Sequence, residues 1–192
     1  MNRIGMARPS WDDEMRQAAV DTLDSLHWVK GPQGKAFGRE FSEYCNAVQG
    51  TPCQSGSVAL WGALRLLEIG PGDEVLVPSL TYIATATCVS LVGATPVFVD
   101  VEPDHWCLDI NALEAARTPQ TKAVIAVHLF GQMCDDALPS WCEEHGIAYI
   151  EDAAQAHGAV AGSGIKAGGI GDVACFSFFP SKNLAVGGEG GM

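Results

Sequence analysis

Short apolar runs alternate with helix-like stretches along most of this chain, and that alternation constrains the fold more than any other feature. Five runs have the length and the β-branched content of strands. They lie near Glu74 to Val77, Thr95 to Val99, Ala123 to Val127, Ile147 to Ile150 and Val173 to Phe176. Helical stretches lie between them, near Tyr82 to Leu91, Ile110 to Ala116 and Asp135 to His145. The pattern predicts an α/β fold with a mostly parallel sheet and crossover helices, in which ligands bind beyond the carboxyl ends of the strands.

Two helices are expected before the sheet. Ser10 is the expected N-cap of the first helix. One face of that helix is formed by Met15, Ala18, Ala19, Thr22 and Leu26. The second helix should carry Phe37, Phe41 and Tyr44. The first part of the chain is therefore expected to be helical.

Size and composition fit one domain with a buried sheet. The chain has 192 residues, of which 47% are hydrophobic, and a mean hydropathy of +0.12, which favours a packed core over disorder. Its formal net charge is -12, and the clustered Lys and Arg that a nucleic-acid surface or an anionic membrane patch needs are absent from the sequence. We therefore expect neither nucleic-acid nor membrane binding.

The cysteines and the N-terminal sequence indicate a reducing cytoplasm. Seven cysteines are an odd number, and they form no Cys-x-x-Cys pair. No secretory segment precedes the charged stretch Trp11 to Glu14, and no apolar run reaches the length of a membrane span. His128 and His157 lack helical ligand spacing and a Cys/His cluster, so we expect neutral structural histidines and no metal site.

Lys182 and Asp152 suggest the chemistry, because each lies at the carboxyl end of an apolar run that is typical of a buried strand. A lysine in such a place is a candidate for a Schiff base with an aldehyde cofactor. The aspartate could hold a pyridinium nitrogen protonated, so that the ring can accept negative charge. Taken alone, each residue is more often a solvated charge or a helix cap. Together they favour pyridoxal 5'-phosphate (PLP).

A phosphate site is expected at Gln54 to Ser57. This short polar segment runs into a helical pattern formed by Leu60, Ala63, Leu64 and Leu67. Free backbone N–H groups and the positive end of the helix dipole favour an anion there. Ser177, five residues before Lys182, offers a further hydroxyl.

Three other features have simpler structural interpretations. The connection from Gly158 to Gly171 is expected to be a flexible surface turn, with a cofactor contact as the alternative. Gly162-Ser163-Gly164 lacks the third glycine and the leading strand of a dinucleotide fingerprint, which disfavours a nicotinamide oxidoreductase. Packing anchors are expected at Trp28, Trp61, Trp106 and Trp141.

Several motifs together carry a resemblance to a known family. They are Ser55 to Leu60, Pro71 to Val75, Pro78 to Thr85, Glu151 to Ala159 and Ser177 to Met192. With these motifs in order, the chain from about residue 28 onward resembles the DegT/DnrJ/EryC1/StrS family of PLP-dependent nucleotide-sugar aminotransferases. The resemblance implies a fold type I large domain, with a helical segment over 1–50 and a PLP-binding domain over 51–192 that stops before the family's C-terminal domain.

The resemblance implies roles around the cofactor ring. Lys182 would form the Schiff base and move the proton, and Asp152 would pair with the pyridine nitrogen. Tyr82 would stack on the ring, and Gln155 would lie near its hydroxyl. The family's sugar dehydratases have histidine in place of the lysine, so Lys182 favours transamination.

The resemblance also implies a phosphate site and a reaction. Ser57, Ser177 and the backbone of Val58 would hold the phosphate, and Ser57 stands where the family usually has threonine. The reaction would transfer an amino group from an amino acid, with glutamate the expected donor, to a nucleotide-linked keto sugar. A homodimer or larger oligomer is expected. The alternatives are a catalytically incompetent PLP-domain fragment and a PLP-binding regulator.

Overall fold

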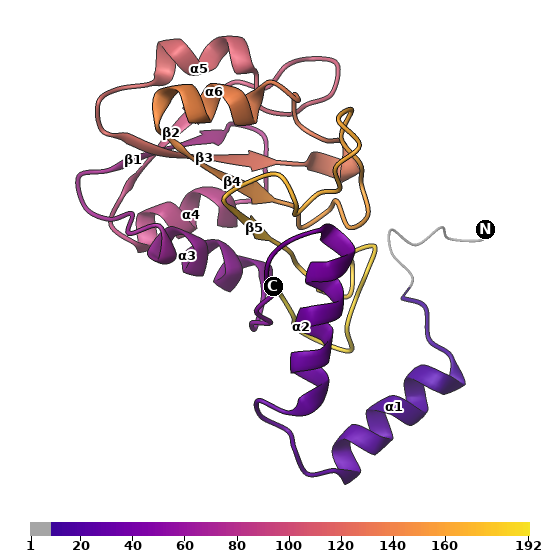
Figure 1. Ribbon diagram of the computed structural model, residues 1–192. Coiled ribbons are helices and arrows are strands. Elements are labelled where there is room, and N and C mark those ends of the chain that lie inside the picture. The colour runs from indigo at the N-terminus through magenta and orange to yellow at the C-terminus, as the bar shows by residue number, and fades with distance from the viewer. Residues whose placement is uncertain (1–8) are drawn as a thin grey trace, which may run out of the picture.

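A five-stranded parallel sheet forms the centre of the computed structural model, which describes residues 9–192 (Figure 1). The strands are β1 (Glu74–Pro78), β2 (Thr95–Val99), β3 (Thr121–Val127), β4 (Ala148–Asp152) and β5 (Val173–Cys175). Their order across the sheet is β2-β1-β3-β4-β5, and each adjacent pair is parallel. The expected α/β fold with a parallel sheet is confirmed.

The direction of strand addition reverses once. The chain passes from β1 outward to β2 and then returns past β1 to β3, β4 and β5. The crossover helices are α4 (Ala84–Leu91) after β1, α5 (Ile110–Ala116) after β2 and α6 (Leu138–His145) after β3. Because crossovers are right-handed, the reversal puts α4 on one face of the sheet and α5 and α6 on the other. The carboxyl ends of β1 and β3 therefore flank a switch point, where such sheets bind ligands.

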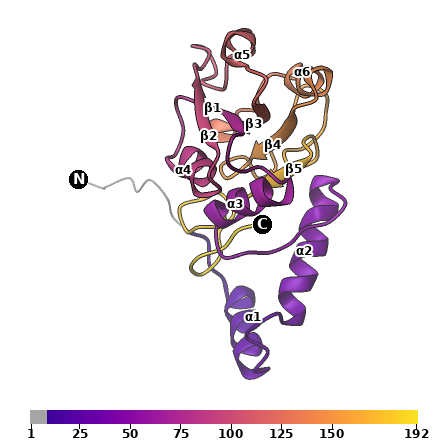
Figure 2. The same ribbon diagram turned by 90° about the vertical axis from the view of Figure 1, so that its left-hand side faces the viewer.

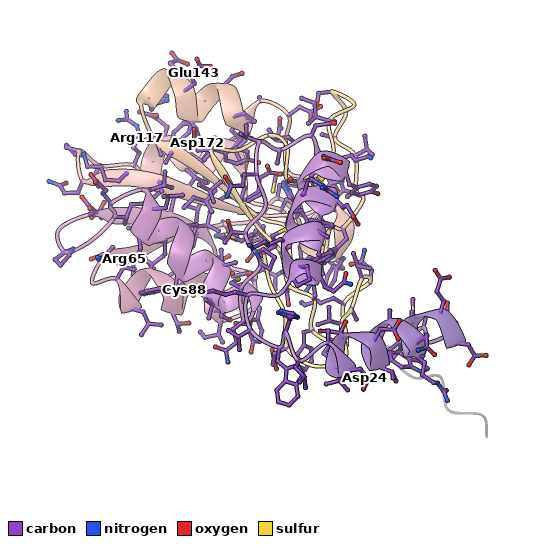
Figure 3. All side chains as sticks on the ribbon, turned by 60° about the horizontal axis from the view of Figure 1, so that its bottom comes forward. Asp24, Arg65, Cys88, Arg117, Glu143 and Asp172 are labelled. Carbon is purple, nitrogen blue, oxygen red and sulfur yellow. The ribbon has the colours of Figure 1, made fainter. Side chains whose placement is uncertain are left out.

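Alternating strand residues build a core on each face of the sheet. Val75 and Val77 pack with α4 and with α3 (Gly56–Leu66), whereas Leu76 packs toward α5 and α6. Figure 2 shows the two helical layers on opposite sides of the strands. Figure 3 labels Arg65 and Cys88 on the α3 and α4 layer, and Arg117 and Glu143 on the other.

A third core lies under β5, where α2 (Pro32–Cys45) packs. The ring of Phe41 lies edge-on to the rings of Phe176 and Phe178, with centroid distances of 4.8 Å and 5.3 Å. The helix begins at Pro32, whose fixed φ suits a first turn. It ends at Asn46, which adopts the left-handed conformation with a φ of 60°. The aromatic cluster supports the segment that follows β5.

The first helix, α1 (Asp13–Asp24), stands away from the sheet in both ribbon views (Figures 1 and 2). Its N-cap is Asp12 and not Ser10, so that prediction is wrong. The Asp12 side chain accepts the N–H of Met15 at 2.8 Å, because only the residue next to the first turn can reach that group. The helix has no buried residue, and Leu26 lies beyond its end. The expected apolar face is therefore not buried within residues 9–192.

Several predicted boundaries shift by a few residues. Helix α4 begins two residues later than expected, and α6 begins at Leu138 rather than Asp135. The Asp135 carboxylate accepts the N–H of Ala137 at 2.8 Å in a turn, and Pro139 then occupies the first helical turn. Strand β4 extends to Asp152, which is therefore the last residue of the strand. Strand β5 is shorter than expected and ends at Cys175.

The expectation that the tryptophans are packing anchors is wrong for three of them. Trp28, Trp61 and Trp106 expose 68%, 44% and 50% of their surface. Trp28 instead donates its indole N–H to the carbonyl of Leu23 at 2.9 Å, which fixes the ring at the surface. Only Trp141 packs at the edge of a core cluster. Sequence alone does not separate an indole in a core from one on an exposed face.

Candidate functional site

A cavity of about 360 Å³ opens at the carboxyl ends of the strands. Six of the seven predicted site residues line it. They are Ser57, Tyr82, Asp152, Gln155, Ser177 and Lys182. The seventh, Val58, lines a different hollow, beside α2. Residues up to 125 positions apart in the sequence thus meet at the edge of the sheet that the strand pattern predicts for a ligand.

Asp152 is the buried acid of the cavity. One carboxylate oxygen accepts the hydroxyl of Thr85 at 3.0 Å, and the other accepts the N–H of Ala154 at 3.2 Å. Burial raises the pKa of Asp152 above its usual value, while these hydrogen bonds and the nearby charge of Lys182 act in the opposite direction. A cationic N–H placed against this carboxylate would favour its ionised form. The carboxylate is therefore set up to bind a protonated ring nitrogen.

Lys182 lies in the connection that follows β5. Its backbone N–H donates to the carbonyl of Phe179 at 2.8 Å and closes a turn. Two backbone hydrogen bonds close the base of this connection. The N–H of Val186 donates to the carbonyl of Phe178 at 2.9 Å, and the N–H of Phe178 donates to the carbonyl of Gly190 at 2.8 Å. This arrangement holds a half-buried lysine at the cavity that Asp152 also lines.

The start of α3 forms a cradle for an anion. Ser55 is the N-cap, and its hydroxyl accepts the N–H of Val58 at 3.3 Å. Gly56 is required here, because a Cβ at this position would lie 2.8 Å from the Cβ of Ser177. This close approach brings the hydroxyl of Ser177 to the first turn, where the N–H groups of Gly56 and Ser57 are directed away from the helix. The Ser55 cap competes for the backbone group of Val58 that we had expected to bind phosphate.

Tyr82 and Gln155 lie at the mouth of the cavity. Tyr82 is 70% exposed and comes from the segment between β1 and α4. Gln155 accepts the N–H of Phe130 through Oε1 at 2.8 Å. Its amide nitrogen can therefore still donate, which suits a contact with a ring hydroxyl oxygen.

Glu151 is fully buried next to Asp152 and has a structural role that its sequence context does not indicate. Its carboxylate accepts three backbone N–H groups, from Gly168, Ile170 and Gly171, at 2.8 to 2.9 Å. Burial alone would raise its pKa, but these bonds and the contact with His128 outweigh burial and hold the pKa below its ordinary value. The end of the glycine-rich connection is thus bound to the strand.

This result corrects the expectation of a flexible surface turn from Gly158 to Gly171. Residues 162–165 are exposed, but Ala167 and Gly168 are buried, and Gly168 approaches the ring of Phe176 so closely that a Cβ would lie 2.7 Å from it. The connection does not line the cavity, so the alternative of a cofactor contact also has no support. The buried carboxylate needed donors, and this connection supplies them.

His128 has the structural role that was expected of it. Its Nδ1 accepts the N–H of Cys134 at 3.2 Å, so the neutral ring carries its proton on Nε2 and donates to Glu151 at 3.0 Å.

Among residues 9–192, no group of three or more His, Cys, Asp and Glu side chains could hold a metal ion. No helix in the described part of the chain is long and apolar enough to cross a membrane.

The chain belongs to the DegT/DnrJ/EryC1/StrS aminotransferase family, whose model matches residues 9–192. It is 49% identical over 182 residues to the UDP-N-acetyl-3-dehydro-alpha-D-glucosamine 3-aminotransferase of Acidithiobacillus ferrooxidans. The matched residues make up 94% of this chain and 49% of that protein. The chain therefore spans about half the length of this curated relative.

Two solved structures share the fold. DesV from S. venezuelae, in complex with a ketimine intermediate, has a TM-score of 0.90 at 47% identity, covering 93% of this chain and 48% of that one. Spr1654 from Streptococcus pneumoniae, in its PLP form, has a TM-score of 0.89 at 33% identity, covering 99% of this chain and 52% of that one. These likenesses agree with a fold type I large domain.

Proposed function

We propose that this chain is the PLP-binding part of an aminotransferase that transfers an amino group from an amino acid to a nucleotide-linked keto sugar. The observation that supports this most directly is that Lys182, Asp152 and the start of α3 line one cavity. A lysine, a buried carboxylate and a helix N-terminus are the three contacts that PLP requires. The similarity to a sugar 3-aminotransferase and to a protein solved in its PLP form supports the same function.

The residues of the cavity fit PLP by the chemistry of their donors and acceptors. When bound, PLP supplies a ring that withdraws electrons from the carbon attached to the reacting nitrogen. Asp152, fixed by Thr85 and Ala154, would hold the ring nitrogen protonated. The hydroxyls of Ser57 and Ser177 and the first N–H groups of α3 would hold the phosphate.

Lys182 would bind the cofactor and then serve as the acid and base of the reaction. Its amine would take a proton from the substrate carbon and return it at the cofactor, which requires a mobile side chain on a fixed backbone. Tyr82 would cover the ring, and the amide nitrogen of Gln155 would donate to the ring hydroxyl. Glutamate is the proposed donor.

Two further proposals concern the setting of the enzyme. All seven cysteines are free thiols, which supports a reducing cytoplasm. Exposed apolar side chains gather at and after α1 and support a homodimer or larger oligomer. They include Leu23, Leu26, Trp28 and Val29, with exposures from 60% to 82%.

Half-transamination tests the proposed function. Purified chain reconstituted with PLP should absorb in the visible range and lose that absorbance when glutamate is added. The Lys182→Ala variant should show neither signal. Stable visible absorbance that no amino acid discharges would favour an incompetent fragment or a PLP-binding regulator. A colourless reconstituted protein would refute PLP binding itself.

A further inference from the structure

His157 and Asn183 form a two-bond clamp between the two segments that carry the predicted cofactor contacts. The Nδ1 atom of His157 lies 2.7 Å from Oδ1 of Asn183, and Nδ2 of Asn183 donates to the backbone carbonyl of His157 at 3.0 Å. His157 follows Asp152 by five residues, whereas Asn183 is the neighbour of Lys182. The clamp therefore ties the segment of the acid to the segment of the lysine.

The two bonds fix the tautomer of His157. Because the Asn183 amide nitrogen donates to a carbonyl, its oxygen is the atom that faces the ring, and Nδ1 must carry a hydrogen to donate to it. Burial lowers the pKa of His157, which favours the neutral ring. Nε2 then holds a lone pair, and it is buried without a hydrogen-bond partner among residues 9–192.

Packing alone does not account for a histidine here. The ring is surrounded by the aromatic rings of Phe41, Phe176 and Phe178, with centroid distances of 5.2 to 6.2 Å. A fully apolar side chain would fill the same space without burying an unpaired nitrogen, which is unfavourable. The bonded Nδ1 atom is what distinguishes histidine from phenylalanine at this position.

The segment around Lys182 has few other restraints. Ser181, Asn183 and Leu184 are exposed. The bonds from Asn183 to His157 are the only side-chain hydrogen bonds that residues 180–186 make within the described part of the chain. Without them, residues 180–186 would keep only two hydrogen bonds to residues 9–192, from the N–H of Lys182 to the carbonyl of Phe179 and from the N–H of Val186 to the carbonyl of Phe178.

We infer that His157 is a positioning residue, which acts through Asn183 to hold Lys182 at the distance from Asp152 that a covalently bound PLP ring requires. This inference rests on the proposed function. His157 does not line the cavity, so it does not act on the substrate. Holding the lysine in place before the cofactor arrives would lower the conformational entropy lost when the covalent bond forms.

Titration with PLP tests the clamp. The apparent Kd is measured from the visible absorbance of the lysine-bound cofactor. His157→Phe keeps an aromatic ring but has no donor, and Asn183→Ala removes the other partner at an exposed position. Asn183→Ala removes both hydrogen bonds and should raise the apparent Kd for PLP about tenfold, whereas His157→Phe keeps the bond to the backbone carbonyl and should raise it about fivefold. The double variant should bind no worse than Asn183→Ala alone, because that change already removes both bonds. His157→Asn places an amide nitrogen where Nδ1 stood, and should restore Kd to within about threefold of the original.

Thermal unfolding of the PLP-free proteins separates positioning from folding. Asn183→Ala should lower the melting temperature by no more than about 5 °C, so that the protein stays folded at the assay temperature while PLP binding weakens, and it keeps the test valid if His157→Phe does not fold. Unchanged PLP binding in Asn183→Ala, or losses that multiply in the double variant, would overturn the clamp. If the original chain binds PLP and the variants bind equally well, only this inference fails. If the original chain forms no coloured adduct, the proposed function fails with it.

Discussion

Replacing Glu151 with glutamine should remove a large part of the free energy of unfolding. One oxygen of Glu151 accepts the N–H groups of Ile170 and Gly171, and the other accepts Gly168 and Nε2 of His128. An amide retains one of these oxygens and turns the other into a donor that faces two donors. Reversing the His128 tautomer does not help, because Nδ1 would then face the N–H of Cys134.

The size of the effect follows from that count. Each buried polar group left unpaired costs about 1–3 kcal/mol, and the amide of glutamine leaves at least two buried donors without an acceptor. We expect Glu151→Gln to lower the free energy of unfolding by about 3–5 kcal/mol, against a typical total of about 5–15 kcal/mol. Urea unfolding followed by circular dichroism measures it. Glu144→Gln, at an exposed position with the same chemical change, should stay within about 0.5 kcal/mol.

The contribution of Glu151 also depends on pH in a defined direction. Its pKa is held below the ordinary value in the folded chain. The stabilisation should therefore be fully present above the unfolded pKa of about 4.3 and be lost as the pH falls through the lower folded pKa. An unfolding free energy for Glu151→Gln within 1 kcal/mol of the original, measured at about pH 7, would refute this account of the buried cluster.

Three further changes test the site and the proposed assembly. Asp152→Asn should retain bound PLP but slow half-transamination with glutamate at least about a hundredfold, because an amide cannot hold the ring nitrogen protonated; equal rates would remove that role. Thr85→Val deletes a hydrogen bond to the carboxylate and should raise the pKa of Asp152 further, so that the loss of PLP binding on acidification begins at a higher pH; an unshifted pH profile would contradict this. Replacing Leu26 and Val29 together with glutamate should dissociate the oligomer in light scattering, while Ser140→Glu, also exposed, should not; a monomeric original would refute the proposed association.

The strand pattern predicted most of the architecture because burial of a parallel sheet leaves a strong local signal. Strand β2 and helix α5 have the bounds that the pattern gives, and Asp152 is the last residue of β4, at the strand end where its apolar run placed it. A local pattern also located the start of α3, since a short polar segment before an apolar helical stripe is a cap signal.

What could not be predicted depends on contacts between distant residues. Thr85 is bonded to Asp152 across 67 positions, and a threonine within an apolar helix gives no sign of such a partner. Glu151 was visible as a carboxylate after a strand, but its donors come from a glycine-rich connection whose composition is typical of a surface turn. The exposure of Trp61 likewise depends on what covers its helix, which the sequence of that helix does not contain.

The central claim is that Lys182 is the residue that bonds to PLP, and mapping a reduced adduct tests it most directly. The chain reconstituted with PLP is treated with borohydride, digested and analysed by mass spectrometry, with Lys166→Ala as the matched control. The amine of Lys166 donates a hydrogen bond to the backbone carbonyl of Tyr44 at the surface, and Lys166 does not line the cavity. We predict a modification at Lys182 that persists in Lys166→Ala and disappears in Lys182→Ala. Modification spread over several lysines, or retained in Lys182→Ala, would contradict the account.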